Sequence, residues 1–255
     1  MYPYVNFFAL HIPSYGLCVC IAMFLCAILA FRRAKKIGLD FNDLLITGAV
    51  AIGCGTLGGM ILYIAVSYDF ETICKQIVSM EFSFLKNPGI VFYGGLIGAI
   101  IGVVVTVRLL KVKAEDVEHC IVPYIPLGHA VGRVGCLLTG CCYGFQYKGI
   151  FAVATRFGDE GETYFPIQIV EALFNLFIMA VLLLYTKKKR LPYNVMAVYL
   201  IMYSVLRFCL EFFRGDAIRG NFLVFSTSQW ISLFIFIISA TIISINYVKM
   251  RKNKD

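Results

Sequence analysis

Charged residues are scarce in this sequence. Only 15% of its 255 residues are charged, whereas 60% are hydrophobic, and the mean hydropathy is +0.82. This composition excludes an ordinary soluble domain and predicts a polytopic helical membrane protein. The basic segment that begins a secretory signal peptide is also missing, because residues 1–12 contain no Lys or Arg. Since there is no long linker, low-complexity tract or internal repeat, we expect residues 1–255 to form a single integral membrane domain.

Most of the sequence consists of long apolar runs. A helix needs about 20 mostly apolar residues to cross a bilayer. Runs of about this length occupy residues 14–31, 44–66, 90–110, 119–138, 167–186, 193–213 and 229–248. We therefore expect an all-α polytopic membrane protein with seven transmembrane helices. The fourth run is the weakest, because it contains prolines, glycines and Arg133.

Lysine and arginine are unevenly distributed between the connecting segments. Clusters after the first, third, fifth and seventh runs hold 15 of the 23 basic residues, and the segments on the other side hold 6. Basic loops remain in the cytoplasm, so this bias predicts an N-terminus outside and a cytoplasmic C-terminus. The net charge of +8 is then a topology signal, and we expect no nucleic-acid partner.

The ten cysteines include no CxxC pair, which excludes the disulfide framework of a small secreted domain. Six lie in apolar runs, where a free thiol behaves as a small hydrophobic group. Only Cys136, Cys141 and Cys142 cluster, and three thiols are too few for a tetrahedral zinc site. We therefore expect no metal or other cofactor. A disulfide from Cys136 to Cys141 or Cys142, and a set of buried thiols, both remain open.

The stretch 126–144 places Arg133 inside an apolar run and surrounds it with glycines. A charge at membrane depth is costly, which makes Arg133 a functional candidate. Glycines expose backbone N–H groups, and an arginine among such groups suits a phosphate. The alternative is a helix-packing motif whose arginine pairs with a carboxylate. His129, one turn earlier, is either a satisfied interior group or a general base.

A second arginine, Arg207, lies in the sixth run. Glu211 follows at i+4 and Arg214 at i+7, so we expect all three on one helix face. A carboxylate orients an arginine whose free edge can then bind an anion. An intrahelical ion pair that only offsets its own burial is the alternative. The predicted topology puts Arg133 and Arg207 in the outer halves of two outward-running helices, so we expect an anion site facing the outer leaflet.

Two further features lie in the third run. Gly94, Gly98 and Gly102 recur every fourth residue, as in a close helix–helix contact. Tyr93 is either an aromatic anchor at the membrane interface or a donor to a lipid head group.

The fifth run begins with Gln168, which could meet a polar ligand, and with Glu171. If Glu171 is buried it needs a partner, and an arginine is the obvious one.

Together these pieces resemble the prolipoprotein diacylglyceryl transferase family of seven-helix bacterial membrane enzymes. They occur in family order along nearly the whole chain: Tyr15-Gly16; Tyr93-Gly94-Gly95; Pro126 to Gly128 with Gly132-Arg133-Val134-Gly135 and Gly140 to Gly144; Pro166 to Gln168 with Glu171; Tyr199 to Tyr203 with Arg207, Glu211 and Arg214; and Ser226 to Gln229. The Gly-Arg-x-Gly and Arg-x-x-x-Glu-Phe-Phe-Arg elements are specific in combination.

The resemblance implies transfer of the diacylglyceryl group of phosphatidylglycerol to the lipobox cysteine of a prolipoprotein, with release of glycerol-1-phosphate, at the outer leaflet of the bacterial cell membrane. We expect four catalytic candidates, which are Arg133, Arg207, Tyr93 and His129. The expected substrate-binding residues are Tyr15, Gly94, Gly95, Cys136, Gly144, Gln168, Glu211 and Arg214.

The chain also departs from the family pattern at four positions. The family usually has histidine at Tyr93, asparagine at Cys136 and Thr139, and glutamate at Cys141. Tyrosine, with an ordinary pKa of about 10, is a poor base at neutral pH. A divergent enzyme with another acceptor, and a non-catalytic lipid-binding or transport protein on the same scaffold, are therefore the alternatives.

Overall fold

The computed structural model describes residues 2–7, 10–68, 79, 91–188, 190–215, 221–222 and 225–252. Five basic residues that entered the topology prediction lie outside these ranges, namely Lys75, Lys86, Lys189, Arg219 and Lys254. The helices are α1 (Ser14–Ile37), α2 (Phe41–Ser67), α4 (Phe92–Leu109), α5 (Ala114–Ile121), α6 (Ile125–Thr139), α7 (Ile167–Tyr185), α8 (Asn194–Glu211) and α9 (Thr227–Lys252). Three short antiparallel hairpins pair β1 (Tyr4–Phe7) with β2 (Leu10–Pro13), β3 (Val153–Ala154) with β4 (Thr163–Tyr164), and β5 (Asn221–Phe222) with β6 (Phe225–Ser226).

The prediction of a helical, polytopic membrane protein is confirmed. Among the described residues, six helical stretches are long and apolar enough to cross a bilayer, namely Ser14–Ile37, Phe41–Ser67, Ala114–Thr139, Ile167–Tyr185, Asn194–Glu211 and Thr227–Lys249. The third predicted run coincides with α4, whose apolar stretch Gly94–Leu109 is shorter. A seventh span and the orientation of the termini therefore stay predictions.

The fourth predicted run is a composite of α5, a 3-10 turn at Val122–Tyr124, and α6. Pro123 lies in that turn and Pro126 in the first turn of α6. Proline lacks an N–H and disfavours the helical conformation of the residue before it, which explains the interruption.

The chain divides into two compact units, Met1–Arg33 with Glu118–Asp255, and Ala34–Val117. In the second unit, α2 and α4 meet through glycines. A Cβ on Gly94 would lie 2.3 Å from the Gly58 carbonyl oxygen, and one on Gly98 would lie 2.2 Å from that of Cys54. The glycine spacing of α4 thus marks a close helix contact, as predicted.

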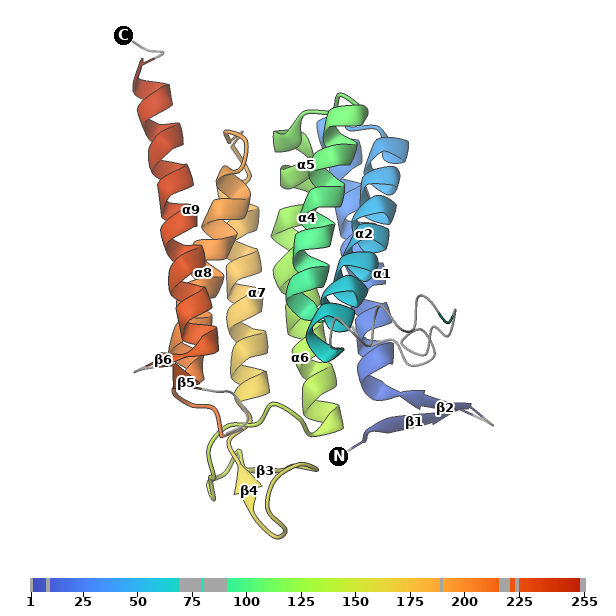
Figure 1. The fold of residues 1–255 in the computed structure, drawn as a ribbon, viewed down its shortest axis with the longest axis vertical. Coiled ribbons are helices and arrows are strands. Elements are labelled where there is room, and N and C mark those ends of the chain that lie inside the picture. Colours follow the sequence, from blue (N-terminus) through green and yellow to red (C-terminus); the bar gives the residue numbers. More distant parts are fainter. Residues whose placement is uncertain are drawn as a thin grey trace. The chain divides into compact units, whose positions relative to one another are not determined.

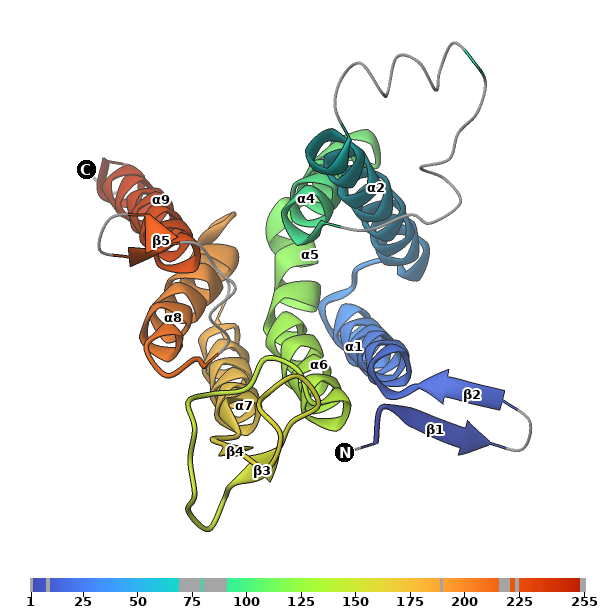
Figure 2. The same cartoon turned by 60° about the horizontal axis from the view of Figure 1, so that its bottom comes forward.

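In the first unit, α7 lies between α6 and α8, and α9 packs against α8 (Figures 1 and 2). The buried face of α7 is polar where it begins, because Gln168, Glu171 and Asn175 are all buried. Its outer face is apolar, and Leu173 and Phe177 are 61% and 59% exposed. Such an arrangement suits a helix with lipid outside and a polar site inside.

We expect Gly98→Ala to destabilise the protein, because its methyl group would collide with the α2 backbone. Overpacking of this kind costs about 1–3 kcal/mol, which is roughly 2–10 °C in melting temperature for a chain of this size. Gly53→Ala in α2 is the matched control, since nothing lies within 4 Å of its added Cβ. Thermal unfolding of the purified proteins in detergent measures both. Equal melting temperatures for the two variants would contradict the glycine contact.

Candidate active site

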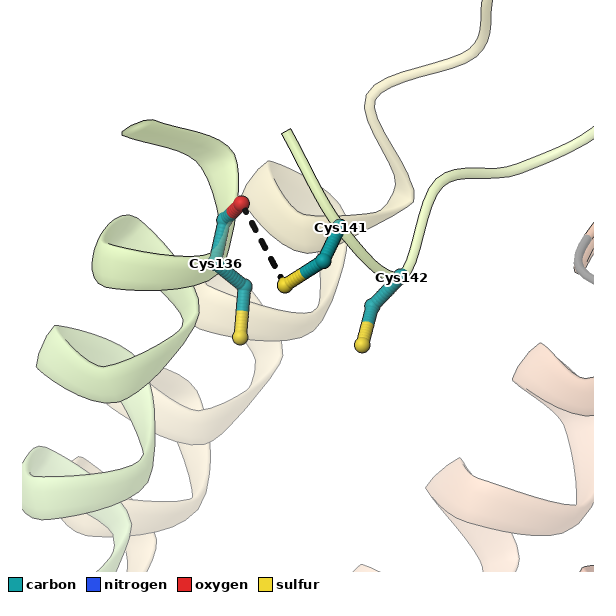
Figure 3. Close-up of side chains that lie close together, drawn as sticks. All are labelled: Cys136, Cys141 and Cys142. Carbon is teal, nitrogen blue, oxygen red and sulfur yellow. Dashed lines mark hydrogen bonds between the residues drawn. The ribbon is translucent and has the colours of Figure 1, made fainter. Parts of the chain in front are cut away.

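The loop after α6 is shaped by two glycines. Gly140 ends the helix in the left-handed conformation, with φ of 79°, and its N–H donates to the Cys136 carbonyl at 2.9 Å. Glycine adopts this conformation without the penalty that a side chain would add. The turn brings the next two residues, Cys141 and Cys142, back beside the end of α6, as Figure 3 shows.

Gly144 lies where three backbone segments cross. It forms a β-bridge with Arg214, and its N–H donates to the Phe165 carbonyl at 3.0 Å. A Cβ here would lie 2.8 Å from that same oxygen and 3.0 Å from the Phe213 carbonyl oxygen. Glycine is therefore required for packing. As a substrate-binding residue, Gly144 stays a prediction.

Arg133 forms an ion pair with Glu171 across α6 and α7. Its Nη2 lies 2.8 Å from Glu171 Oε1, and the side chains are 20% and 4% exposed. The expectation that a buried Glu171 takes an arginine partner is confirmed. Arg133 Nη1 also reaches the Cys136 sulfur at 3.9 Å, so one guanidinium contacts both a carboxylate and a thiol.

Arg207 is held in the same way by its own helix. Its Nη2 lies 2.8 Å from Glu211 Oε2, with both side chains nearly buried, and 3.4 Å from the Ser228 hydroxyl. Ser226 Oγ donates to Glu211 Oε1 at 3.0 Å, which ties the beginning of α9 to the pair. Arg207 Nη1 is buried and has no hydrogen-bond partner among the residues that the structure describes. An unused buried N–H of an arginine is available to an anion.

The expected position of Arg214 on the helix face of Arg207 and Glu211 is wrong. The helix α8 ends at Glu211, and Arg214 instead belongs to the bridge with Gly144. Arg214 still interacts electrostatically with Arg207. The reason is that the backbone leaves the helix and pairs with the loop after α6, which sequence spacing does not reveal.

Two residues connect the arginines. Glu171 and Tyr203 interact electrostatically with both Arg133 and Arg207. Both arginines thus share Glu171 and Tyr203 as electrostatic neighbours inside the first unit, and these four side chains are called the polar centre. Such a centre can bind an anion and take up charge that develops on a leaving group.

His129 lies beside this centre but is already bonded. Its Nδ1 lies 3.1 Å from the Tyr199 hydroxyl, and its ring packs against Tyr203 with centroids 5.0 Å apart. These contacts favour the interpretation of His129 as a satisfied interior group. Its role as a general base stays a prediction.

The three clustered cysteines are free thiols whose sulfur atoms all lie within 4.8 Å of one another (Figure 3). Gln168 is buried, and its Nε2 donates to the Cys141 carbonyl at 2.7 Å, which fixes the turn. The neighbouring Cys136 and Cys141 thiols lower the pKa of the Cys142 thiol, and the charges of Arg214 and Arg133 act in the same direction. The Cys141 thiol itself donates to the Cys136 carbonyl at 3.8 Å.

Tyr15 belongs to the first unit and lies against α6. A Cβ on Gly135 would meet the Tyr15 ring at 3.2 Å, so these helices approach closely. Tyr93, Gly94 and Gly95 belong to the second unit. Gly94 is buried against α2, and the assignment of all three to the substrate site stays a prediction.

Comparison with known proteins decides between a generic anion site and an enzyme family. The family model for prolipoprotein diacylglyceryl transferase matches residues 4–245. The chain belongs to this family. A phosphatidylglycerol–prolipoprotein diacylglyceryl transferase 2 of Clostridium perfringens is 34% identical over 96% of this chain and 95% of its own length. The corresponding transferase of Clostridium tetani is 34% identical over 94% and 95%. That of Francisella tularensis strain SCHU S4 is 27% identical over 99% and 97%.

The prolipoprotein diacylglyceryl transferase resemblance of the sequence is thus confirmed along almost the full chain. The structure adds three residues to which the sequence gave no role: Tyr203, which interacts with both arginines, Ser226 at the end of β6, and Ser228 in the first turn of α9. The Ser226–Gln229 stretch was recognisable as a family element. Its position beside Arg207 and Glu211 depends on the return of the chain from α8 to α9.

We expect Glu171→Ala to destabilise the protein, because it leaves Arg133 without a countercharge. Breaking a buried ion pair costs about 3–5 kcal/mol, and somewhat less here because Arg133 retains some solvent exposure. The matched control is Glu162→Ala, which breaks the exposed pair of Glu162 with Lys148 and should cost about 0–1 kcal/mol. Melting temperatures in detergent compare the two. An unchanged melting temperature for Glu171→Ala would show that the pair does not hold α6 to α7.

Proposed function

We propose that this chain transfers the diacylglyceryl group of phosphatidylglycerol to the cysteine thiol of a prolipoprotein, forming a thioether and releasing glycerol-1-phosphate. Family membership and relatives of that name, aligned over nearly their full length, support the reaction. The observation that carries the proposal is the pair of arginines around one buried centre, each oriented by a carboxylate.

The chemistry requires such a centre. A thiolate attacks a glyceryl carbon, the carbon–oxygen bond to phosphate breaks, and the phosphate leaves with the electron pair. Arg133 and Arg207 hold that phosphate and take up the charge that grows on it. Glu171 and Glu211 neutralise the arginines before the lipid binds, which limits the cost of keeping two cations in an apolar bundle.

We also propose that the site faces the outer leaflet of the cell membrane. Within the first unit, Lys187 and Lys188 follow α7, and Arg251 lies in the last turn of α9. The C-terminal ends of α7 and α9 lie opposite the loop with β3 and β4 (Figure 1). Basic ends mark the cytoplasmic side. The loop and the adjoining ends of α6 and α8 then lie outside, where prolipoproteins arrive.

This orientation has a direct test. A fluorescent-protein reporter after Asp255 should fold in the cytoplasm and fluoresce, and an alkaline phosphatase reporter at the same point should be inactive. An epitope inserted after Ile150, which is 96% exposed, should be reached by antibody on intact spheroplasts. An active phosphatase together with a protected epitope would show that the chain has the opposite orientation.

The shared phosphate site predicts the effect of arginine substitutions. Lysine keeps the charge but not the bidentate contact, so Arg133→Lys and Arg207→Lys should each lose most turnover while the fold is kept. The expected loss is roughly 10²–10³-fold, or about 3–4 kcal/mol, by analogy with donors that stabilise an oxyanion. Because both serve one leaving group, the double variant should lose clearly less than the product of the two single losses.

The measurement is single-turnover transfer of radiolabelled diacylglyceryl to a lipobox peptide, with mass spectrometry of the product. Arg156→Lys in the exposed loop is the matched control and should keep the wild-type rate. Near-wild-type rates for either site variant, or fully independent losses, would contradict one phosphate site. Release of glycerol phosphate without lipidation of the peptide would point to another acceptor.

A further inference from the structure

The cysteine cluster at the end of α6 is not used by the mechanism above. Its members come from two segments, Cys136 from the last turn of α6 and Cys141 and Cys142 from the turn that follows (Figure 3). No two of the three sulfur atoms are more than 4.8 Å apart. Sulfur ligands of one zinc ion lie about 3.8 Å apart, which follows from Zn–S bonds of about 2.3 Å. Movements of roughly 1 Å would therefore bring all three onto one ion.

The backbone holds this arrangement in place. Gly140 and Cys142 both have positive φ, of 79° and 59°. A positive φ is rare outside glycine and is retained where the surroundings fix it. The N–H groups of Gly140 and Cys141 both donate to the Cys136 carbonyl, and buried Gln168 donates to the Cys141 carbonyl. The turn is thus anchored to the helix end and to α7, as a preorganised metal site requires.

Nearby charges suit anionic sulfur. Arg133 points Nη1 at the Cys136 sulfur at 3.9 Å, and Arg214 interacts with Cys142. Three thiolates on a divalent ion carry one net negative charge, which Arg214 offsets, because Glu171 already balances the charge of Arg133. N–H donors to ligand sulfur are a common outer shell of metal sites.

Three protein ligands leave one position open. Closed structural zinc sites use four protein ligands, whereas sites that act on a substrate use three and keep the fourth for water or substrate. Cys136 is buried but Cys141 and Cys142 are partly exposed, so the open side faces away from the helix core. The count of three cysteines that argues against a closed zinc site therefore fits an open one.

The reaction needs a thiolate, and the acid–base groups described at the arginine centre are already engaged. Glu171 and Glu211 are bound to arginines, and His129 is bonded to Tyr199. A zinc ion supplies the missing step without a base, because a coordinated thiol loses its proton.

We propose that Cys136, Cys141 and Cys142 bind one zinc ion whose fourth position takes the acceptor thiol. The assignment of the acceptor rests on the proposed function. The thiol releases its proton to water as it coordinates. Its sulfur then bonds to the glyceryl carbon, the carbon–oxygen bond breaks, and the phosphate leaves towards Arg133, which adjoins both the cluster and the Glu171 pair.

The test uses the full-length protein purified in detergent under reducing conditions. Metal analysis after incubation with Zn²⁺ and desalting should find about one zinc per chain. Cys136→Ser, Cys141→Ser and Cys142→Ser should each weaken zinc affinity by roughly 100-fold or more, since outer-shell changes alone cost 10–100-fold. Cys20→Ser and Cys209→Ser, at exposed cysteines elsewhere, are matched controls and should bind zinc as the wild type does. Melting temperatures confirm that each variant is folded.

Cobalt(II) in place of zinc reports the fourth ligand without any turnover. The wild type should show sulfur-to-cobalt charge-transfer bands and visible d–d bands, both lost in the three site variants. A lipobox peptide with cysteine should shift the bands, and the same peptide with serine should not. Absent bands, bands retained in the site variants, or a disulfide among the three cysteines in freshly purified protein would overturn the metal site. Bands that do not shift when the cysteine peptide is added would overturn the proposal of an open fourth position.

The zinc site and the proposed transfer reaction can be refuted independently of each other. A protein that binds zinc and the peptide thiol but transfers no lipid would keep the metal site and refute the transfer reaction. Full transfer after complete removal of zinc by a chelator would keep the transfer reaction and refute the role of the metal.

Discussion

Burial of two arginines in an apolar helix bundle is the constraint on which the first unit depends. Removing a cation from water costs several kcal/mol unless a countercharge and hydrogen bonds replace the lost hydration. Arg133 meets this requirement through Glu171 on the neighbouring helix, and Arg207 through Glu211 on its own. The first pair fixes α6 against α7, and the serines bound to the second fix the beginning of α9 against α8. The contacts that make the charges tolerable therefore also determine which helices are neighbours.

The loops at this end follow from the same need. Gly140 turns the chain back at the end of α6, and Gly144 lets the loop pass between the Phe165 and Phe213 backbones. A side chain at Gly144 would push these segments apart and separate Arg214 from the cluster of thiols. The two glycines thus allow the loop after α6 to form one side of the site. They act through backbone geometry, and none of them needs to contact a ligand to be indispensable.

Much of this organisation was predictable from the sequence, because it depends on period and composition. The apolar runs gave the helices, the spacing of Arg207 and Glu211 gave their pair, and the buried Glu171 required an arginine partner. What depends on chain reversals was not predictable. Arg214 was placed on α8 by counting residues, although the helix stops at Glu211. Tyr203 and Ser228 join the site only because α8 packs against α7, where the Tyr203 ring reaches His129 of α6, and because α9 returns along α8. No local pattern encodes these contacts.

The donor geometry of Arg133 explains how one side chain can serve several partners. A guanidinium has five N–H donors in a rigid plane, whereas an ammonium has three on a single nitrogen. In Arg133, Nη2 is directed at Glu171 and Nη1 at the Cys136 sulfur, and the side chain keeps a fifth of its surface exposed. Its remaining donors can meet a phosphate while the carboxylate holds the plane in place. In the displacement, the sulfur nucleophile and the phosphate leaving group lie on opposite sides of the glyceryl carbon, and a guanidinium fixed beside the phosphate takes up the charge that develops on it.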